Sequence, residues 1–295
     1  MKLEFGTGSR FGRFNYKSAK RLIDYALDHG ITRFDTGYSY CKFKSQPLLA
    51  KCLKSEINSR REEIILSTKC AAISGEYINF CVNKSIETFE SGYLDHFHLW
   101  GSTVKDIESN NVLQEIRSLV KQGKIKTASV NTHEIETIKK ISTGFYPDIK
   151  GIMLDYNLLK QNRLNFIRES KKNGISIFAG TVLCQGLLIN SISKIMLKTL
   201  SPFYLARFCI REQTREYIKP SKIIRDYTKR KYNHIYKSIP LSFVINEKLI
   251  DSIPIGMLSI ESINQNLSIA RNPVSKKITD EIAEWALENC QIKDS

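Results

Sequence analysis

The sequence predicts a (β/α)₈ barrel, and three observations lead to this fold class. Short β-branched runs alternate with longer segments in which apolar residues recur at helical spacing. Eight such units in a chain of 295 residues suit a closed barrel better than an open, doubly wound sheet. The first strand leads into GTGSRFG, which lacks the G-x-G-x-x-G spacing of an open-sheet dinucleotide site.

The individual elements follow from local composition. Expected strands are short runs rich in β-branched and aromatic residues. In chain order they cover residues 2–8, 31–37, 63–70, 94–101, 125–131, 149–157, 175–183 and 251–256. Helical spacing predicts helices over residues 16–30, 46–57, 75–91, 107–124, 133–143, 163–174, 240–248 and 260–271, and a last helix near the C-terminus. Gly30 suits the C-cap of the first helix.

A long basic insertion interrupts the repeat after the seventh strand. Residues 189–237 are too many for an unstructured loop, so we expect two helices there, over residues 201–218 and 221–237. Between Lys194 and Lys237, twelve Lys and Arg oppose three Asp and Glu. Because loops that follow strands emerge at the barrel mouth, the insertion would form a lid over an anionic small-molecule substrate. A protein-docking or self-association surface over residues 201–237 is the alternative.

Composition narrows the class of protein. The apolar fraction of 42% and the charged fraction of 25% are globular values, and we expect one barrel domain over residues 1–295. The seven scattered cysteines favour reduced thiols, with no disulfide frame and no metal site. We expect no membrane span and no secretion signal, and therefore a cytoplasmic protein. The net charge of +15 comes without any nucleic-acid-binding motif, so no nucleic-acid partner is expected.

Three polar residues stand at the ends of neighbouring strands. Asp35 and Tyr40 belong to FDTGYSY, and Lys69 ends the third strand. In a barrel the C-terminal strand ends form one mouth, so these side chains should meet there. A nearby ammonium lowers the pKa of a phenol from its usual ~10, and a carboxylate would hold that ammonium in place. The set predicts proton transfer to or from a substrate oxygen.

With these residues in view, the sequence resembles the aldo-keto reductase superfamily. The family's Asp-Thr-Ala-x-x-Tyr reads Asp35-Thr36-Gly37-Tyr38-Ser39-Tyr40 here, and ILSTKC carries the matching Lys69. Further similar stretches are GKIKTASVNTHE, YNLLKQN, GISIFAGTVLCQGLL and IPIGMLSIESINQNL, and the resemblance runs from about residue 3 to 285. It is closest in flavour to short bacterial members linked with carbohydrate or secondary metabolism.

The resemblance implies an oxidoreductase that binds NADPH or NADH and reduces a carbonyl, or oxidises an alcohol, on a sugar-like or natural-product substrate. Tyr40 would be the general acid, Lys69 would lower its pKa, and Asp35 would anchor Lys69. Tyr38 is expected in the substrate pocket.

The fourth strand departs from the family pattern. LDHFHLWG places His96, His98 and Trp100 on one face of the strand, since alternate residues share a face. Trp100 stands where the family has its catalytic histidine; an indole donates one hydrogen bond and relays no proton. His98 should lie on the order of 6–7 Å deeper along the strand. We therefore expect both histidines to be hydrogen-bonded groups in the inner barrel layers, and Trp100 to line the substrate pocket.

The cofactor segment also differs from the family. The resemblance assigns Asn131, Thr132, Gly180, Gly256, Glu261 and Asn266 to cofactor binding. Met153 replaces a glutamine, and Gly180 replaces a tyrosine that stacks on the nicotinamide. In the family, basic residues bind a 2′-phosphate. Their positions would align near Gly256, Leu258 and Ser262 here, and none of these three is basic. A catalytically silent barrel with a binding or regulatory role, or a non-redox reaction on the same scaffold, therefore stays open as an alternative.

Overall fold

The eight strands lie within the ranges that the sequence predicts. The structure is a computed structural model that describes residues 2–199, 212–290 and 292. Its strands are β1 (Leu3–Gly6), β2 (Arg33–Asp35), β3 (Ile65–Cys70), β4 (Leu94–Trp100), β5 (Ile125–Asn131), β6 (Gly151–Asp155), β7 (Ser176–Gly180) and β8 (Ile253–Gly256).

All strand pairs are parallel, and the strand order is β7-β6-β5-β4-β3-β2-β1-β8. The first strand thus pairs with both the second and the last. A parallel bridge between Phe178 of β7 and Ser252, just before β8, joins the two ends of this order. The sheet therefore closes as the (β/α)₈ barrel that the sequence predicts.

The helices that connect the strands also follow the predicted order. They are α1 (Gly8–Phe11), α2 (Tyr16–Asp28), α3 (Tyr40–Phe43), α4 (Ser45–Arg60), α5 (Gly75–Phe89), α6 (Val104–Glu108), α7 (Val112–Lys121), α8 (Ile135–Ser142), α9 (Leu164–Lys172), α10 (Ile192–Thr199), α12 (Glu212–Glu216), α13 (Ile218–Lys231), α14 (Ile239–Asn246), α15 (Ile260–Arg271) and α16 (Lys276–Asn289). Short 3₁₀ turns are η1 (Arg61–Glu63), η2 (Gln161–Arg163) and η3 (Cys184–Gly186).

One predicted helix is wrong. The single helix expected over residues 107–124 is divided into α6 and α7, because Asn110 and Asn111 adopt φ values of 49° and 60°. Asparagine enters this left-handed region more readily than most residues, and a right-handed helix cannot continue through it.

On β1, β2 and β4, polar side chains point into the barrel and phenylalanine side chains point outward. Phe5, Phe34 and Phe97 are fully buried on the outward faces. Alternate positions on the same strands carry Glu4, Arg33 and His96. Arg33 Nε and Nη2 donate to Glu4 Oε1 at 3.2 and 3.1 Å, and Ser252 Oγ donates to the same oxygen at 2.6 Å. Charged groups of opposite sign are therefore paired inside the barrel.

The described residues form two compact units. The first is Met1–Leu154, Phe166–Phe178 and Asp251–Gln265, and the second is Asp155–Asn165, Ala179–Ile250 and Asn266–Ser295. A single domain over residues 1–295 stays a prediction.

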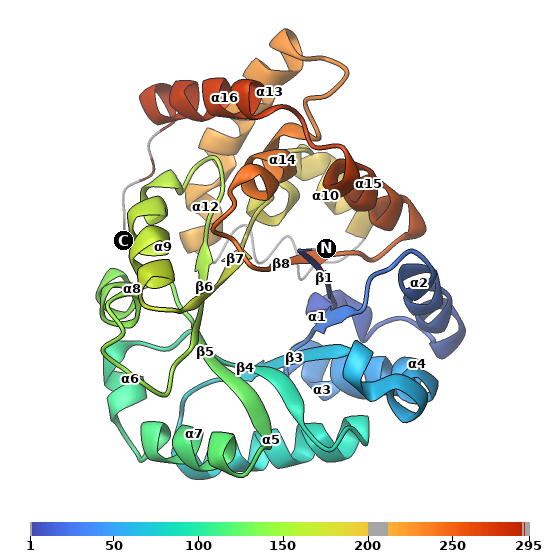
Figure 1. The fold of residues 1–295 in the computed structure, drawn as a ribbon. Helices are drawn as coiled ribbons and strands as arrows, with labels where there is room; N and C mark the ends of the chain where they lie inside the picture. The colour runs from blue at the N-terminus through green and yellow to red at the C-terminus, as the bar shows by residue number, and fades with distance from the viewer. Residues whose placement is uncertain (1, 200–211, 291, 293–295) are drawn as a thin grey trace. The chain divides into compact units, whose positions relative to one another are not determined.

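The insertion of residues 189–237 belongs to the second unit. Residues 200–211, where most of the first expected helix falls, lie outside the described residues; the second is α13, which ends at Lys231 rather than at Lys237. α13 lies beside α16 (Figure 1). Tyr227 of α13 stacks on Trp285 of α16 with ring centroids 3.7 Å apart, and Tyr232 donates to Glu281 of α16 at 2.8 Å. Two tyrosines of the insertion, Tyr227 and Tyr232, therefore contact α16 within this unit. Whether the insertion acts as a lid or as an interface stays a prediction.

Among the helices of the described residues, none is long and apolar enough to cross a lipid bilayer.

Candidate active site

The first unit brings Asp35 and Lys69 into a buried ion pair. Asp35 ends β2, and Lys69 lies near the end of the adjacent strand β3. Lys69 Nζ donates to Asp35 Oδ1 at 2.5 Å and to Oδ2 at 2.7 Å. The Lys69 side chain is 3% exposed and the Asp35 side chain 7%. Two of the three protons on this ammonium are therefore committed to Asp35.

The pKa values of the pair follow from burial and from each other. Burial raises the pKa of Asp35 from 3.8 to about 6, although the Lys69 charge opposes this rise. Burial alone would lower the pKa of Lys69, but the charges of Asp35 and Tyr40 outweigh burial and raise it. At neutral pH both members of the pair are therefore charged.

Tyr40 lies beside this pair and is held by an unusual backbone. Lys69 Nζ is 5.4 Å from the centre of the Tyr40 ring. A Cβ atom built on Gly37 would lie 2.9 Å from the Tyr40 ring, so the ring rests directly on the Gly37 backbone. The three residues after Tyr40, Cys41, Lys42 and Phe43, have left-handed φ values of 53°, 53° and 65°. Each costs on the order of 1–2 kcal/mol, so local strain accompanies the placement of Tyr40.

Trp100 faces Tyr40 from the end of β4. The two rings meet edge to face with centroids 6.2 Å apart and an interplanar angle of 87°. Trp100 also lines a small hollow of about 260 Å³, here called the rim pocket, with the loops that follow β3 and β4. Asp35, Tyr40, Lys69 and Trp100 therefore form one constellation.

Tyr38 lies in an aromatic cluster next to this constellation. Its ring contacts Phe43 at 5.3 Å and Phe80 at 6.1 Å, measured between centroids. Phe43 and Phe80 are 54% and 55% exposed, so the cluster opens an apolar surface to solvent. The role of Tyr38 in a substrate pocket stays a prediction.

The expectation of hydrogen-bonded core histidines is wrong. His98 is fully buried, and neither of its ring nitrogens has a hydrogen-bond partner among the described residues. The same holds for Nδ1 of His96. Their neighbours are aromatic: Phe178 meets the His96 ring at 5.1 Å and the His98 ring at 4.8 Å. Burial lowers the pKa of His96 to about 4 and that of His98 well below its usual value, so both are neutral at pH 7.

Four of the expected cofactor residues lie in the same unit. Asn131 pairs in register with Trp100 and Met153, and its Nδ2 donates to the Met153 sulfur at 2.7 Å. Thr132 is buried, and its hydroxyl accepts from the Glu134 N–H at 3.1 Å. Gly256 is exposed, and open space surrounds the position of a Cβ atom there. Glu261 lies in the first turn of α15.

The other two expected cofactor residues belong to the second unit. Gly180 ends β7, and its carbonyl accepts from the Tyr156 N–H at 3.3 Å. Asn266 is buried within α15. The roles of all six residues stay predictions.

Comparison with known proteins decides the family. A family model described as the aldo/keto reductase family matches residues 2–286. The chain belongs to the aldo/keto reductase family.

Relatives agree with this assignment. The uncharacterized oxidoreductase YqkF of Bacillus subtilis is 20% identical over 94% of this chain and 89% of its own length. The aldo-keto reductase YhdN of the same organism is 25% identical over 63% of this chain and 58% of its own length.

Solved structures share the fold. An aldo-keto reductase of Bacillus halodurans in its holo form gives a TM-score of 0.76 at 19% identity, over 97% of this chain and 91% of that one. A Klebsiella pneumoniae aldo/keto reductase in complex with NADP and acetate gives 0.71 at 16% identity, over 99% and 94%. The family generally comprises NAD(P)H-dependent oxidoreductases.

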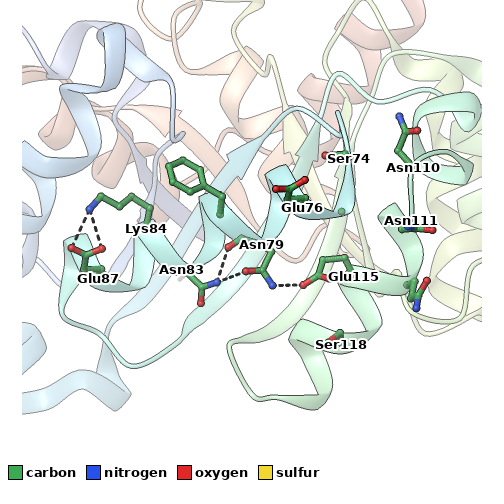
Figure 2. Close-up of a pocket in the computed structure, with 13 residues that line it drawn as sticks. Ser74, Glu76, Asn79, Asn83, Lys84, Glu87, Asn110, Asn111, Glu115 and Ser118 are labelled. Carbon is green, nitrogen blue, oxygen red and sulfur yellow. Dashed lines mark hydrogen bonds and ion pairs between the residues drawn. The ribbon is translucent and has the colours of Figure 1, made fainter.

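A second hollow on this chain is not lined by Tyr40. It is a groove of about 1030 Å³ between α5 and α7, here called the outer groove (Figure 2). Figure 2 shows a chain of polar contacts in it: Asn83 Nδ2 donates to Asn79 Oδ1, and Asn79 Nδ2 donates to Glu115, each at 2.5 Å. The groove shares Asn110 with the rim pocket. The buried ion pair lies beside Tyr40 and not in the groove.

Sequence reasoning missed two features of this site. The sequence shows Gly37 only as part of a motif. The contact between Gly37 and the Tyr40 ring depends on the three-dimensional shape of the turn. The left-handed run at Cys41–Phe43 has no sequence signal, since none of the three is glycine or asparagine. By contrast, Asn110-Asn111 between α6 and α7 does carry such a signal, because asparagine enters the left-handed region more readily than most residues.

Proposed function

We propose that this chain is an active oxidoreductase that reduces a carbonyl, or oxidises the corresponding alcohol, with Tyr40 as the general acid or base. The observation that carries the proposal is Lys69, a buried ammonium between the Asp35 carboxylate and the Tyr40 ring. The Tyr40 charge raises the pKa of Lys69. Because this interaction is reciprocal, Lys69 favours the phenolate form of Tyr40.

The roles then follow from the contacts. Tyr40 gives its proton to the substrate oxygen during reduction, and the resulting phenolate lies beside the Lys69 ammonium. Asp35 holds that ammonium in place and favours its charged form. Trp100, edge-on to Tyr40, donates its indole N–H to the same oxygen or supports the substrate by ring contact. When bound, the reduced nicotinamide supplies the hydride.

The residues of the first unit fit a dinucleotide. Asn131 donates only to a thioether sulfur, a weak acceptor, so its amide can turn to a carboxamide at small cost. Gly256 leaves open space for a ligand to approach the backbone. No Lys or Arg occurs between Lys248 and Arg271, and Glu261 is acidic. A 2′-phosphate therefore lacks a cation in this segment, and we propose NADH as the preferred cofactor.

The substrate is proposed to be sugar-like or a natural product with a polar distal part. Amide and carboxylate side chains, which bind hydroxyl groups well, line the outer groove, and Phe80 adds an exposed ring. Asn110 belongs to both the groove and the rim pocket beside Trp100. A molecule with its carbonyl at Tyr40 could thus extend along these walls.

The test is a titration of the pure protein with NADH and with NADPH, followed by cofactor fluorescence. We expect binding of NADH at micromolar concentration and weaker binding of NADPH. Turnover of a panel of aldoses, ketoses and aromatic aldehydes should follow, and Tyr40→Phe should abolish it while cofactor binding persists. Binding of neither cofactor at millimolar concentration would refute the proposal and favour a silent barrel. Cofactor binding with turnover unchanged in Tyr40→Phe would remove Tyr40 from the mechanism.

A further inference from the structure

Buried polar atoms without partners are concentrated inside the barrel. Among the described residues, Ser67 Oγ, Ser129 Oγ, Glu4 Oε2, His96 Nδ1 and both ring nitrogens of His98 lack a hydrogen-bond partner. Their residues occupy inward positions of β1, β3, β4 and β5. Buried polar groups normally find a protein or water partner. Six such atoms in one barrel interior therefore call for a common explanation.

Strand register makes these residues neighbours. Asp35 pairs with Ser67 and Ser67 with His96, while Lys69 pairs with His98 and His98 with Ser129. Neighbouring strands are ~4.8 Å apart, so the His98 ring lies one strand away from the Lys69 stem. Burial lowers the pKa of His98 most, and the charges of Lys69 and His96 lower it further. His98 is thus the inward neighbour of the Lys69–Asp35 pair.

His96 continues this line away from the site. The His96 and His98 rings are 6.5 Å apart between centroids and inclined by 29°. That separation is too long for a direct hydrogen bond and suits one bridging water. His98 is fully buried, whereas His96 is partly exposed. The pair therefore spans the distance between solvent on one side and Lys69 on the other.

We propose that His96 and His98 form a proton path through the barrel interior that returns a proton to Lys69, and through Lys69 to Tyr40, after each reduction. The proposal rests on the proposed function, because only a reductase consumes the Tyr40 proton. With cofactor and substrate in the mouth, Tyr40 is covered from that side. The proposed path along β4 does not pass through the mouth.

Each transfer in the path is balanced. After Tyr40 protonates the substrate oxygen, the phenolate takes a proton from Lys69 Nζ. Lys69, then a neutral amine, takes the N–H proton of His98 through a water, because neither His98 nitrogen contacts Lys69 directly. The other ring nitrogen of His98 takes a proton from the bridging water, and that water takes one from a ring nitrogen of His96. The second nitrogen of His96 takes a proton from bulk solvent, so the base that replaces the consumed proton forms in the bulk and not inside the barrel. His98 thereby changes tautomer without gaining net charge, which a neutral imidazole with two unpartnered nitrogens can do.

The surrounding charges favour this neutral relay. Glu4 is paired with Arg33, and Asp35 with Lys69, so the interior groups nearest the histidines sum to zero. Arg33 and Lys126 oppose a charge on His96, while Asp95 favours one; Lys69 opposes a charge on His98. Arg61 and Lys126 both pair with Asp95 on the outward side of the strand. A permanent imidazolium is thus disfavoured at both positions.

The kinetic test compares His98→Gln with Phe178→Leu. Glutamine keeps polarity and approximate size but cannot exchange a proton between two atoms as imidazole does. Phe178→Leu disturbs the packing of both histidines and leaves them able to relay. We expect His98→Gln to lower kcat at least about tenfold at pH 8 with KM for cofactor unchanged. We also expect it to enlarge the solvent deuterium isotope effect, and Phe178→Leu to do neither.

A chemical rescue separates relay from packing. His98→Gly should regain part of its kcat with added imidazole, and Phe178→Leu should not respond. His96→Gln should also lower kcat and enlarge the solvent deuterium isotope effect, but by less than His98→Gln does. A normal kcat and isotope effect in both glutamine variants, with an active wild-type enzyme, would overturn the proposal.

A measurement without turnover distinguishes failure of the path from failure of the proposed function. In ¹⁵N-histidine-labelled protein, a proton path predicts that the His98 N–H exchanges rapidly with bulk water. Exchange should slow in His96→Gln, and the ring nitrogen shifts should change in Lys69→Met. Slow exchange of the His98 N–H in the wild-type protein would refute the path whether or not the protein reduces carbonyls. A wild-type protein that is inactive but shows rapid exchange of the His98 N–H would refute the proposed reductase function and would not refute the path.

Discussion

The buried Asp35–Lys69 pair predicts an unusual dependence of stability on pH. Folding raises the pKa of Asp35 from 3.8 to about 6. The folded state therefore binds more protons than the unfolded state between these values, and the contribution of Asp35 to stability is lost as pH rises through this window. At about 1.4 kcal/mol per pH unit, the loss is about 3 kcal/mol, and it ends above pH 6 where Asp35 is charged in both states.

Lys69 sets the pH at which this loss ends. Lys69→Met keeps the length of the stem but removes the charge that holds Asp35 ionised. Burial, the dominant cause of the raised pKa, then acts unopposed by Lys69. Asp35 should stay protonated in the folded state beyond pH 7. The loss between pH 4 and pH 7 should then grow to about 4 kcal/mol and continue above pH 7.

The assay is urea unfolding from pH 4.5 to pH 8.5 on four proteins: wild type, Asp35→Asn, Lys69→Met and the double variant. Subtracting the Asp35→Asn curve in each background cancels all other titrating groups. In the wild-type background the difference should become flat above about pH 6. With Met at residue 69 it should keep falling by about 1.4 kcal/mol per pH unit past pH 7. Plateaus at the same pH in both backgrounds would refute the idea that Lys69 keeps Asp35 charged.

Three further predictions concern the placement of Tyr40. Gly37→Ala puts a Cβ atom 2.9 Å from the Tyr40 ring, so we expect kcat to fall about tenfold or more with little change in melting temperature; unchanged kcat would contradict this contact. Lys42→Gly removes a left-handed side-chain penalty at φ 53° and should raise the free energy of unfolding by about 1 kcal/mol in urea, and a lower value would show that the turn is not strained. Trp100→Phe keeps a ring but loses the indole N–H, so kcat should fall about tenfold while KM for cofactor stays constant; equal loss in Trp100→Phe and Trp100→Leu would point to packing instead.

The positions of the strands were predictable because they depend on the local sequence, namely on short β-branched runs and the turn residues that bound them. Each strand lies inside its expected range, since β-branched runs bounded by turn residues leave few other structures open. The pairing of Asp35 with Lys69 was also predictable, because neighbouring strand ends must meet at one mouth. The division of α6 from α7 depended on backbone angles at Asn110 and Asn111, which periodicity does not report.

The state of the histidines was not predictable from sequence. Alternation shows that His96 and His98 face inward, but it does not show what lies opposite them. The opposing residue is Phe178, an aromatic side chain from β7 that offers neither nitrogen a conventional partner. The sequence-based expectation assumed that a buried histidine would find one. Contacts between strands distant in the chain decide such questions.

β4 carries both the departure from the family pattern at Trp100 and the two interior histidines. Trp100 occupies the rim position where a histidine would be expected from the family resemblance, and an indole passes on no proton. The capacity to carry protons is present on the same face two and four residues earlier, at His98 and His96. If a rim residue had to return the proton while the mouth is covered, an indole in place of histidine would not supply it. A route beneath Lys69 removes this conflict, because Trp100 is then free to shape the rim pocket while proton return occurs on the other side of the ion pair.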